Sequence, residues 1–175
     1  MIIVGAAGRM GKRFIALSAE SGDFDIVGAV EMPGHPDMDK DSGLNAGSNP
    51  NNVMIADSFP PAEADVVVDF SLPEAMDKTI DICVKRGISL VSGTTGLSVS
   101  QKEKIKNSAK KIPILYTTNM SVGMNVLFAL AGKAAAMLGD DYDIEIIEPQ
   151  RRVKNAAPSG SALTIAENIC AATER

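Results

Sequence analysis

The sequence predicts an α/β fold built on a doubly wound parallel sheet, and two observations carry this prediction. Strand-like apolar runs alternate with helix-like runs along the first 120 residues, which is typical of parallel sheets with right-handed crossovers. Glycine-rich or polar stretches also follow four of the strands, at 5–11, 69–71, 93–96 and 117–120. Because the carboxyl ends of parallel strands share one edge of the sheet, we expect these stretches to lie where such sheets bind ligands.

Composition limits the class of protein. With 175 residues, 45% hydrophobic and 22% charged, the chain fits one soluble domain or little more. A net charge of −5 gives no electrostatic footprint for nucleic acid. Cys83 and Cys170 are expected to be buried free thiols, and a single His35 excludes a histidine-based metal cluster, so we expect no metal. With no signal peptide and no apolar run long enough for a bilayer, we expect a cytoplasmic protein with no membrane partner.

The first strand and helix, expected at residues 1–4 and 12–19, enclose a glycine-rich turn with Gly5, Gly8 and Gly11. This is a variant of the dinucleotide-binding fingerprint, in the strand–turn–helix context that supports it. Gly5 permits the tight turn, Gly8 lets the backbone approach a pyrophosphate, and Gly11 allows the helix to pack closely on the strand.

The second strand, residues 25–31, ends in an acid, Glu31, which lies 20 residues after Gly11. An acid at this spacing binds a ribose 2′-OH in dinucleotide sites, although a surface glutamate would give the same pattern. An acid here also repels a 2′-phosphate and favours NAD over NADP. Arg9 and Lys12 could each reach a phosphate, so use of both cofactors stays open.

The middle of the chain continues the alternation. Residues 32–53 are rich in Gly, Pro, Asn and Asp and predict a long loop. An apolar strand follows at 64–70, and Ser71 with Glu74 forms the pattern of a capping box. This pattern predicts a helix that ends at about Arg86.

The last predicted strand–helix–strand unit begins with a strand at 88–91. A second capping box, Ser98 with Gln101, predicts a helix ending near Lys111. The strand at 112–116 completes the expected sheet.

The C-terminal part has a different pattern. It predicts a helix at 121–138, a strand at 143–147 and a helix at 159–172. Between the last two lie three cations, Arg151, Arg152 and Lys154. Cations beside a helix N-terminus form a site for a small anion, although a solvated basic loop is the alternative.

Five motifs stand in the order and spacing of one known family: Gly-Ala-Ala-Gly-Arg-Met-Gly at 5–11, Asp-Phe-Ser at 69–71, Ser-Gly-Thr-Thr-Gly at 92–96, Asn-Met-Ser-Val-Gly-Met-Asn at 119–125, and Lys-x-x-Ala-Pro-Ser-Gly-Ser at 154–161. The sequence resembles the dihydrodipicolinate (4-hydroxy-tetrahydrodipicolinate) reductases over nearly its whole length. The resemblance implies a Rossmann-type dinucleotide-binding domain at 1–120. It also implies the start of a second α+β domain at 121–175, which binds substrate and assembles a homotetramer. The family pattern extends beyond Arg175, so we expect this second domain to be incomplete.

The activity implied by the resemblance is hydride transfer from NADH or NADPH to a cyclic dicarboxylate, in the diaminopimelate route to lysine. Residues that match the family's cofactor contacts run from the pyrophosphate through the ribose to the nicotinamide: Gly5, Gly8, Arg9, Met10 and Gly11, then Glu31, then Phe70, Gly93, Thr95, Asn119 and Met120. Residues that match the contacts to the substrate carboxylates are Thr94, Arg151, Lys154, Gly160 and Ser161.

The sequence departs from the family at the expected proton donor. Where the family has two consecutive histidines, this chain has Gln150 and Arg151, and a further histidine position holds Val153. Glutamine cannot act as a general acid, so catalysis would depend on Lys154 or water, with Gln150 restricted to hydrogen bonding. The alternative is a catalytically idle or repurposed relative that binds dinucleotide and a small dicarboxylate as a sensor or scaffold.

Overall fold

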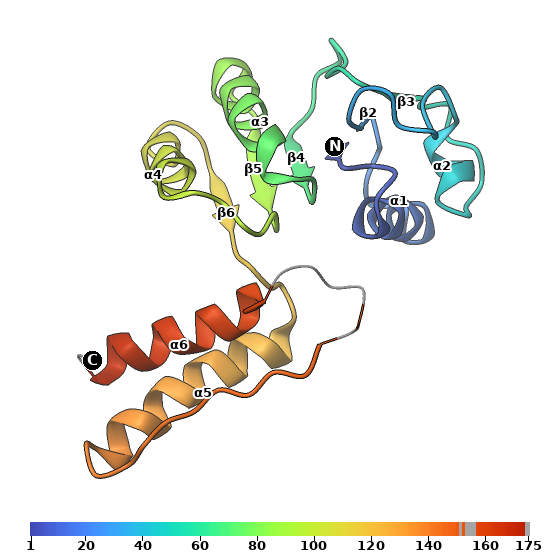
Figure 1. Ribbon diagram of the computed structural model, residues 1–175. Coiled ribbons are helices and arrows are strands. Elements are labelled where there is room, and N and C mark those ends of the chain that lie inside the picture. Colours follow the sequence, from blue (N-terminus) through green and yellow to red (C-terminus); the bar gives the residue numbers. More distant parts are fainter. Residues whose placement is uncertain (151, 153–156, 174–175) are drawn as a thin grey trace. The chain divides into compact units, whose positions relative to one another are not determined.

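The computed structural model describes residues 1–150, 152 and 157–173 (Figure 1). The chain divides into two compact units, Met1–Tyr116 and Thr117–Arg175. The first unit contains the observed sheet, and the described residues of the second contain two helices.

The predicted doubly wound parallel sheet is confirmed. All pairings between its strands are parallel, and the strand order is β3-β2-β1-β4-β5-β6. The chain builds outward from β1 in one direction and then from β4 in the other, so the topological switch lies between these two central strands. The strands are β1 Ile2–Val4, β2 Gly28–Val30, β3 Ile55–Ala56, β4 Val66–Asp69, β5 Ser89–Ser92 and β6 Ile114–Tyr116.

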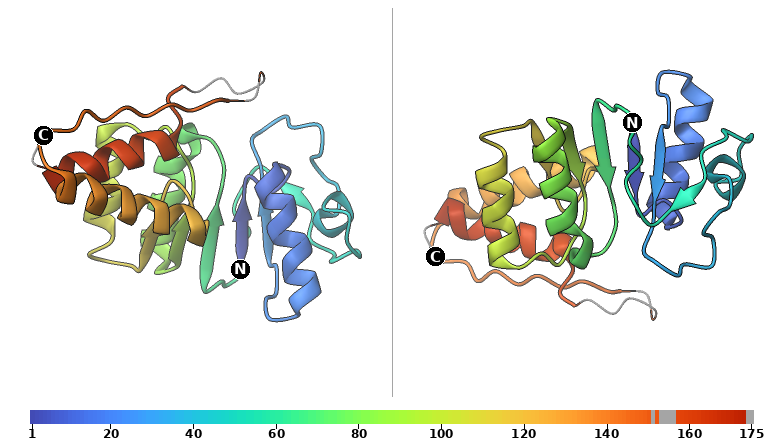
Figure 2. Two further views of the ribbon diagram at one scale, coloured as in Figure 1. Left: turned by 90° about the horizontal axis from the view of Figure 1, so that it is seen from below. Right: turned by 90° about the horizontal axis from the view of Figure 1, so that it is seen from above.

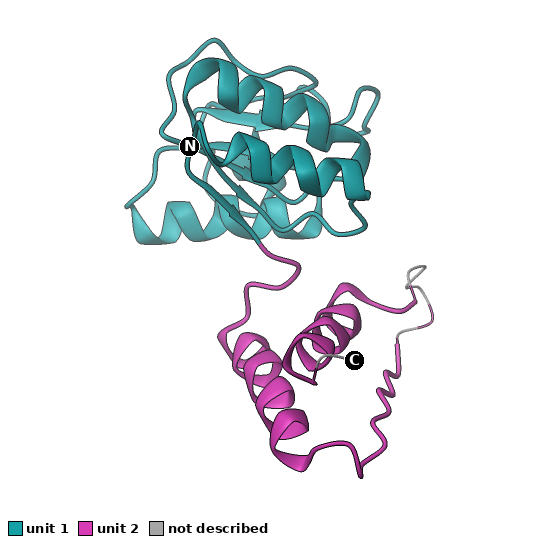
Figure 3. Ribbon diagram, turned by 90° about the vertical axis from the view of Figure 1, so that its left-hand side faces the viewer, with its two compact units in different colours: residues 1–116 teal, residues 117–175 magenta. Residues whose placement is uncertain are grey.

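Helices cover both faces of the sheet. Helix α1 packs its buried Ile15 on one face, while α3 and α4 cover the other (Figure 2). These elements all belong to the first unit, which is teal in Figure 3. The helices are α1 Arg9–Ser21, α2 Ser42–Asn45, α3 Pro73–Arg86 and α4 Val99–Ser108.

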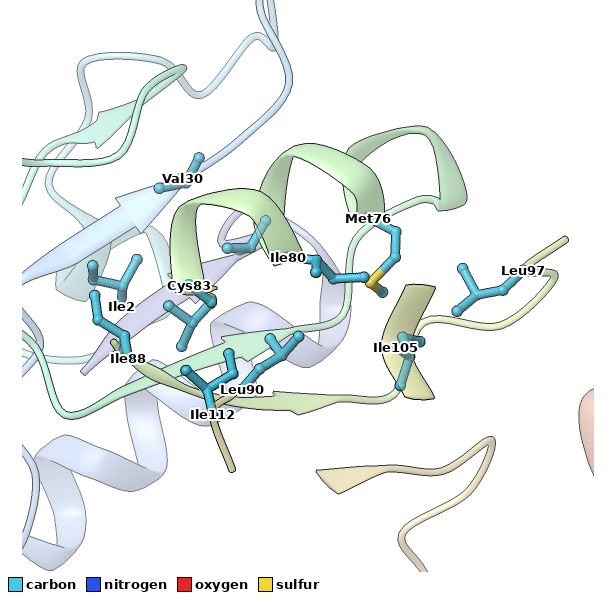
Figure 4. Packing of buried hydrophobic residues seen from close by; sticks show 12 residues of the cluster. Ile2, Val30, Met76, Ile80, Cys83, Ile88, Leu90, Leu97, Ile105 and Ile112 are labelled. Atoms are coloured by element: carbon cyan, nitrogen blue, oxygen red, sulfur yellow. The ribbon is translucent and has the colours of Figure 1, made fainter. Parts of the chain in front are cut away.

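The larger core cluster lies between the sheet and helices α3 and α4 (Figure 4). Met76, Ile80 and Cys83 recur on one face of α3 and are fully buried against Ile2 and Leu90 of the sheet. Full burial of a large apolar side chain contributes about 1.5–3 kcal/mol. This face of α3 therefore fixes the helix on the strands whose ends form the ligand edge.

The two predicted capping boxes have different outcomes. The box at the start of α4 is confirmed, because the Ser98 hydroxyl accepts from Gln101 N and the Gln101 side chain accepts from Ser98 N. The box at the start of α3 is wrong, since the helix is preceded by Leu72 without a side-chain cap. The Ser71 hydroxyl instead donates to the Asp69 carboxylate at 2.6 Å.

The second unit, magenta in Figure 3, is formed by α5 (Val122–Leu138) and α6 (Gly160–Thr173). The helices pack closely at Gly132, where a Cβ would lie 2.9 Å from the Asn168 carbonyl oxygen. Helix α5 begins after Ser121, whose hydroxyl accepts from Met124 N. Within the described parts of the chain, no helix combines the length and apolar character needed to cross a bilayer.

Two predictions for the second unit are wrong. Residues 143–147 form no strand, and Ile147 is 85% exposed. An alternating apolar run forms a strand only against a partner, and the described residues of this unit offer no strand to pair with it. Cys170 is exposed on α6, whereas Cys83 is buried as predicted.

Two helical glycines give a matched test of the packing. A Cβ at Gly11 would lie 2.2 Å from the Gly5 carbonyl oxygen, whereas a Cβ at Gly123 meets nothing closer than 3.9 Å. We expect Gly11→Ala to lower the free energy of unfolding by about 1–3 kcal/mol, because the loop backbone must move. Gly123→Ala, on an open surface of α5, should raise it by up to about 1 kcal/mol. Urea denaturation followed by circular dichroism measures both, and equal stability of Gly11→Ala and wild type would contradict the close packing.

Candidate functional site

The turn between β1 and α1 has the backbone geometry of an anion site. Gly5 has a φ of +77°, and the amides of Gly5 and Ala6 both donate to the Val30 carbonyl oxygen, at 2.9 and 3.1 Å. Helix α1 begins after Gly8, which offers no side-chain cap. The first N–H groups of α1 therefore lack a side-chain partner there and are suited to a phosphate.

Glu31 ties this turn to the end of β2. Its Oε2 accepts from Ala7 N at 3.0 Å, and its Oε1 accepts from Met32 N at 2.9 Å. A carboxylate oxygen can accept more than one hydrogen bond, so both oxygens keep capacity for ribose hydroxyls. Glu31 thus holds the turn and also faces the adjacent cavity.

A cavity of about 540 Å³ lies beside these residues, within the size range of small-molecule sites. Its lining includes three of the predicted cofactor residues besides Glu31: Gly5, Gly8 and Phe70. The ionisable groups in the lining are three carboxylates and one ammonium: Glu31, Asp57, Glu74 and Lys78. The cavity is therefore acidic overall.

The two cations predicted near the turn, Arg9 and Lys12, differ in exposure and in pairing. Arg9 and Met10 are exposed in the first turn of α1. The Lys12 ammonium lies 3.5 Å from the Asp37 carboxylate, which also pairs with Lys40. Hydrogen bonds from the Lys40 and Asn45 side chains hold the pKa of Asp37 well below its usual range. Lys12 thus faces a carboxylate that stays ionised, and Arg9 is the more available of the two predicted phosphate contacts.

The residues predicted near the nicotinamide include a close contact between two loops. A Cβ at Gly93 would lie 2.2 Å from Cε1 of Phe70, so only glycine leaves room for this ring. The Phe70 ring also packs on Phe14, with centroids 5.0 Å apart. Thr95 is exposed in the same loop, whereas Thr94 is only 2% exposed. The Thr94 hydroxyl donates inward to the Ser71 carbonyl oxygen, so its role as a substrate contact stays a prediction.

Asp69 is fully buried at the end of β4. Its Oδ1 accepts from both the amide and the hydroxyl of Ser71, while Oδ2 has no hydrogen-bond partner among the described residues. Burial raises the pKa of this carboxyl, and the bonds from Ser71, with a smaller contribution from Thr94, oppose the rise. Burial, with the nearby Asp69 charge, also raises the pKa of the Cys83 thiol to about 12.

In the second unit, a direct contact joins residues predicted for cofactor and substrate. Asn119 follows the end of β6 by three residues, and its Nδ2 donates to the Ser161 hydroxyl at 3.1 Å. The neighbouring hydroxyls of Thr118 and Thr164 lie 2.8 Å apart. The segment after β6 is therefore fastened to the first turn of α6.

The cationic loop is only partly described. Arg151, Val153 and Lys154 lie outside the described residues, so their predicted roles are not placed. The Glu148 carboxylate accepts from the Ser159 amide at 3.1 Å and from its hydroxyl, and this hydroxyl accepts from Ala162 N. The N–H group and hydroxyl of Ser159, just before α6, thus already bind a carboxylate of the chain itself, and binding of a substrate carboxylate by Gly160 and Ser161 stays a prediction.

Comparison with known proteins identifies the family. Residues 1–120 match the sequence model described as "Dihydrodipicolinate reductase, N-terminus", and residues 123–175 match "Dihydrodipicolinate reductase, C-terminus". The chain belongs to the dihydrodipicolinate reductase family. It is 41% identical over 177 residues to the 4-hydroxy-tetrahydrodipicolinate reductase of Anaeromyxobacter sp. (strain Fw109-5). It is 39% identical over 175 residues to that of Citrifermentans bemidjiense.

These dihydrodipicolinate reductase relatives are longer than the chain. The matches cover 100% and 99% of this chain, but 65% and 66% of the two relatives. A solved structure, "Dipicolinate bound Dihydrodipicolinate reductase from Paenisporosarcina sp. TG-14", matches 98% of the chain and 65% of its own, with a TM-score of 0.65 and 24% identity. This structural likeness supports the fold.

Two acidic residues of this family member have no role in the sequence-based prediction, namely Asp69 and Glu148. Each ends or follows an apolar run and accepts hydrogen bonds from a serine further along the chain, at Ser71 and Ser159. For Asp69, the signals in the sequence are its charge at the end of a buried strand and its place in the Asp-Phe-Ser motif at 69–71. Charge on a strand that is otherwise apolar indicates a buried partner, but it does not say which one.

The raised pKa of Asp69 gives a pH-dependent prediction. Because the folded state keeps a proton that the unfolded chain releases above about pH 4, wild type should lose stability as pH rises until the folded carboxyl also ionises. Asp69→Asn cannot titrate and should lack this loss. Urea denaturation at a series of pH values should show the stability of wild type falling relative to the variant. The exposed Asp23→Asn serves as control, and parallel profiles for Asp69→Asn and wild type would contradict the raised pKa.

Proposed function

We propose that the protein is an NAD(P)H-dependent 4-hydroxy-tetrahydrodipicolinate reductase, acting by hydride transfer to a cyclic dicarboxylate in the diaminopimelate route to lysine. The observation that carries the proposal is the acidic cavity beside the glycine turn. Hydrogen bonds to Glu31 join this turn to the end of β2. Family membership supplies the reaction class, since the relatives are named for this activity.

NADH is the favoured cofactor. Bound NADH would supply the hydride, while the turn at Gly5 and Gly8 and the start of α1 would hold its pyrophosphate. Glu31 would accept from the ribose hydroxyls, and the carboxylates of the lining disfavour an additional 2′-phosphate. Lys12 faces Asp37, which leaves Arg9 as the cation that could still support NADPH.

The substrate carboxylates would be bound by Lys154, Arg151, Gly160 and Ser161. The hydrogen bond between Asn119 and Ser161 supports a shared role for the residues predicted near the nicotinamide and those predicted near the substrate. A dianion suits cationic side chains and the N–H groups at the start of a helix.

The proton would come from Lys154 or water. Gln150 carries no acidic proton, but its Nε2 is buried without a hydrogen-bond partner among the described residues. This amide could donate to a substrate oxygen and orient the ring.

We further propose that the protein is cytoplasmic and that it works as a homo-oligomer, with the homotetramer of the family as the expected form.

Turnover tests the reaction directly. With tetrahydrodipicolinate precursor present, the chain should oxidise NADH, and Lys154→Ala should lower kcat by about 10²–10⁴-fold if Lys154 donates the proton. Lys133→Ala, an exposed lysine on α5, is the matched control and should act as wild type. NADH binding without any oxidation would refute the reductase and support a binding role. Unchanged kcat in Lys154→Ala would instead assign the proton to water.

Cofactor preference depends on Glu31. We expect wild type to bind NADH more tightly than NADPH. In Glu31→Gln, NADH affinity should fall by about tenfold, as one charged hydrogen bond is lost, and the preference over NADPH should shrink because the repelling charge is gone. Fluorescence titration with both cofactors measures this. Glu20→Gln, outside the cavity lining, is the control, and an unchanged ratio of the two affinities in Glu31→Gln would exclude Glu31 from the ribose site.

A further inference from the structure

Asp69 is the last residue of β4 and lies at the edge of the sheet where three loops begin. In register, it lies between Val4 of β1 and Ser92 of β5. The Asp69 carbonyl oxygen accepts from Gly93 N at 3.0 Å, and the Val4 carbonyl oxygen accepts from Phe70 N at 3.1 Å. The glycine turn, the segment after β4 and the loop after β5 therefore start from adjacent backbone positions around Asp69.

The side chain of Asp69 adds a second connection. Its Oδ1 accepts from Ser71 N at 2.9 Å and from the Ser71 hydroxyl at 2.6 Å. The carbonyl oxygen of Ser71 in turn accepts from the Thr94 hydroxyl at 3.5 Å. Hydrogen bonds thus run from the loop after β5, through Ser71, to the carboxyl at the end of β4. All three residues are at least partly buried, and Asp69 and Thr94 are almost completely so.

Phe70 is held at the centre of this arrangement. It lies between Asp69 and Ser71 in the chain, so the turn closed by Oδ1 fixes its backbone on both sides. Its ring fills the space left by Gly93 and borders the cavity. A change in the turn would move the ring and, with it, the loop that carries Thr95.

Asp69 also has a feature that a purely structural residue would not need. Its Oδ2 is buried and has no hydrogen-bond partner among the residues that the structure describes, and such a group costs free energy. The buried Cys83 thiol of α3 is near enough for the Asp69 charge to raise its pKa, and no salt bridge to Asp69 is found in the described part of the chain. An apolar residue at this strand end would avoid the cost but could not close the turn at Ser71.

We propose that Asp69 is a positioning residue, which sets the turn at Phe70 and Ser71 and the loop at 93–96 so that Phe70 and Thr95 face the nicotinamide part of the cofactor. The proposal rests on the proposed dinucleotide-binding function. Asp69 itself touches neither cofactor nor substrate. It acts through the hydrogen bonds from Ser71 and Thr94, so Thr94 becomes a positioning residue as well.

The test compares variants that keep or remove the acceptor. Asp69→Ala loses Oδ1 and should weaken NADH binding by about tenfold, whereas Asp69→Asn keeps an acceptor and should stay within about twofold of wild type. Thr94→Val should weaken binding, and Thr94→Ser should restore it. Because Asp69 and Thr94 act through one connection, the loss in the double variant Asp69→Ala/Thr94→Val should be smaller than the product of the two single losses.

Two further measurements separate positioning from loss of stability and from failure of the proposed function. Ile105→Ala, at a buried core position of α4, should lower stability without lowering NADH affinity in the folded protein. Amide hydrogen exchange, which needs no cofactor, should be faster at Ser71 and also at 93–95 in Asp69→Ala.

If wild type binds no NADH, the proposed function fails, while the exchange result still decides whether Asp69 sets both loops. Wild-type NADH affinity in Asp69→Ala, equal losses in Asp69→Asn and Asp69→Ala, or faster exchange confined to Ser71 would each overturn the inference.

Discussion

The site depends on the close approach of backbones at the switch between β1 and β4. A Cβ at Gly5 would lie 2.9 Å from the Phe70 carbonyl oxygen, and one at Gly11 would lie 2.2 Å from the Gly5 carbonyl oxygen. The loop after β1 is therefore packed between α1 and the loop after β4, with no room for a side chain at Gly5 or Gly11. This contact places the cavity beside main-chain N–H groups, and it couples the position of Phe70 to that of the glycine turn.

Carboxylates accept hydrogen bonds from backbone N–H groups at three places in the chain. Glu31 accepts from the turn after β1, Asp69 from the turn after β4, and Glu148 from the start of α6. Hydrogen bonds from backbone N–H groups to carboxylates are stronger than those between neutral groups. They hold these segments before any ligand binds, so less conformational entropy is lost on binding.

The sheet and the cofactor turn could be predicted from the sequence because their signals are local. Gly5, Gly8 and Gly11 indicate positions where the backbone leaves no room for a side chain, and apolar runs indicate buried strands. The predictions fail where a partner that is distant in the sequence decides the local structure. Ser71 has the pattern of a cap, but Asp69 competes for its hydroxyl, whereas Ser98 meets no such competitor and caps α4. The run at 143–147 has the period of a strand, but a strand also needs a neighbour, which local sequence does not report.

Glu31 and Asp69 show that burial, more than residue type, decides whether a carboxylate can contact a ligand or can only position other residues. Both carboxylates accept two hydrogen bonds from the chain, and both lie beside the ends of central strands. Glu31 is half-exposed at the cavity, so its remaining lone pairs can reach a ribose. Asp69 is fully buried, so its Oδ2, which has no hydrogen-bond partner among the described residues, can reach no ligand. In the proposed function, the same chemical group would therefore contact the cofactor directly at one strand end and act only through the backbone at the other.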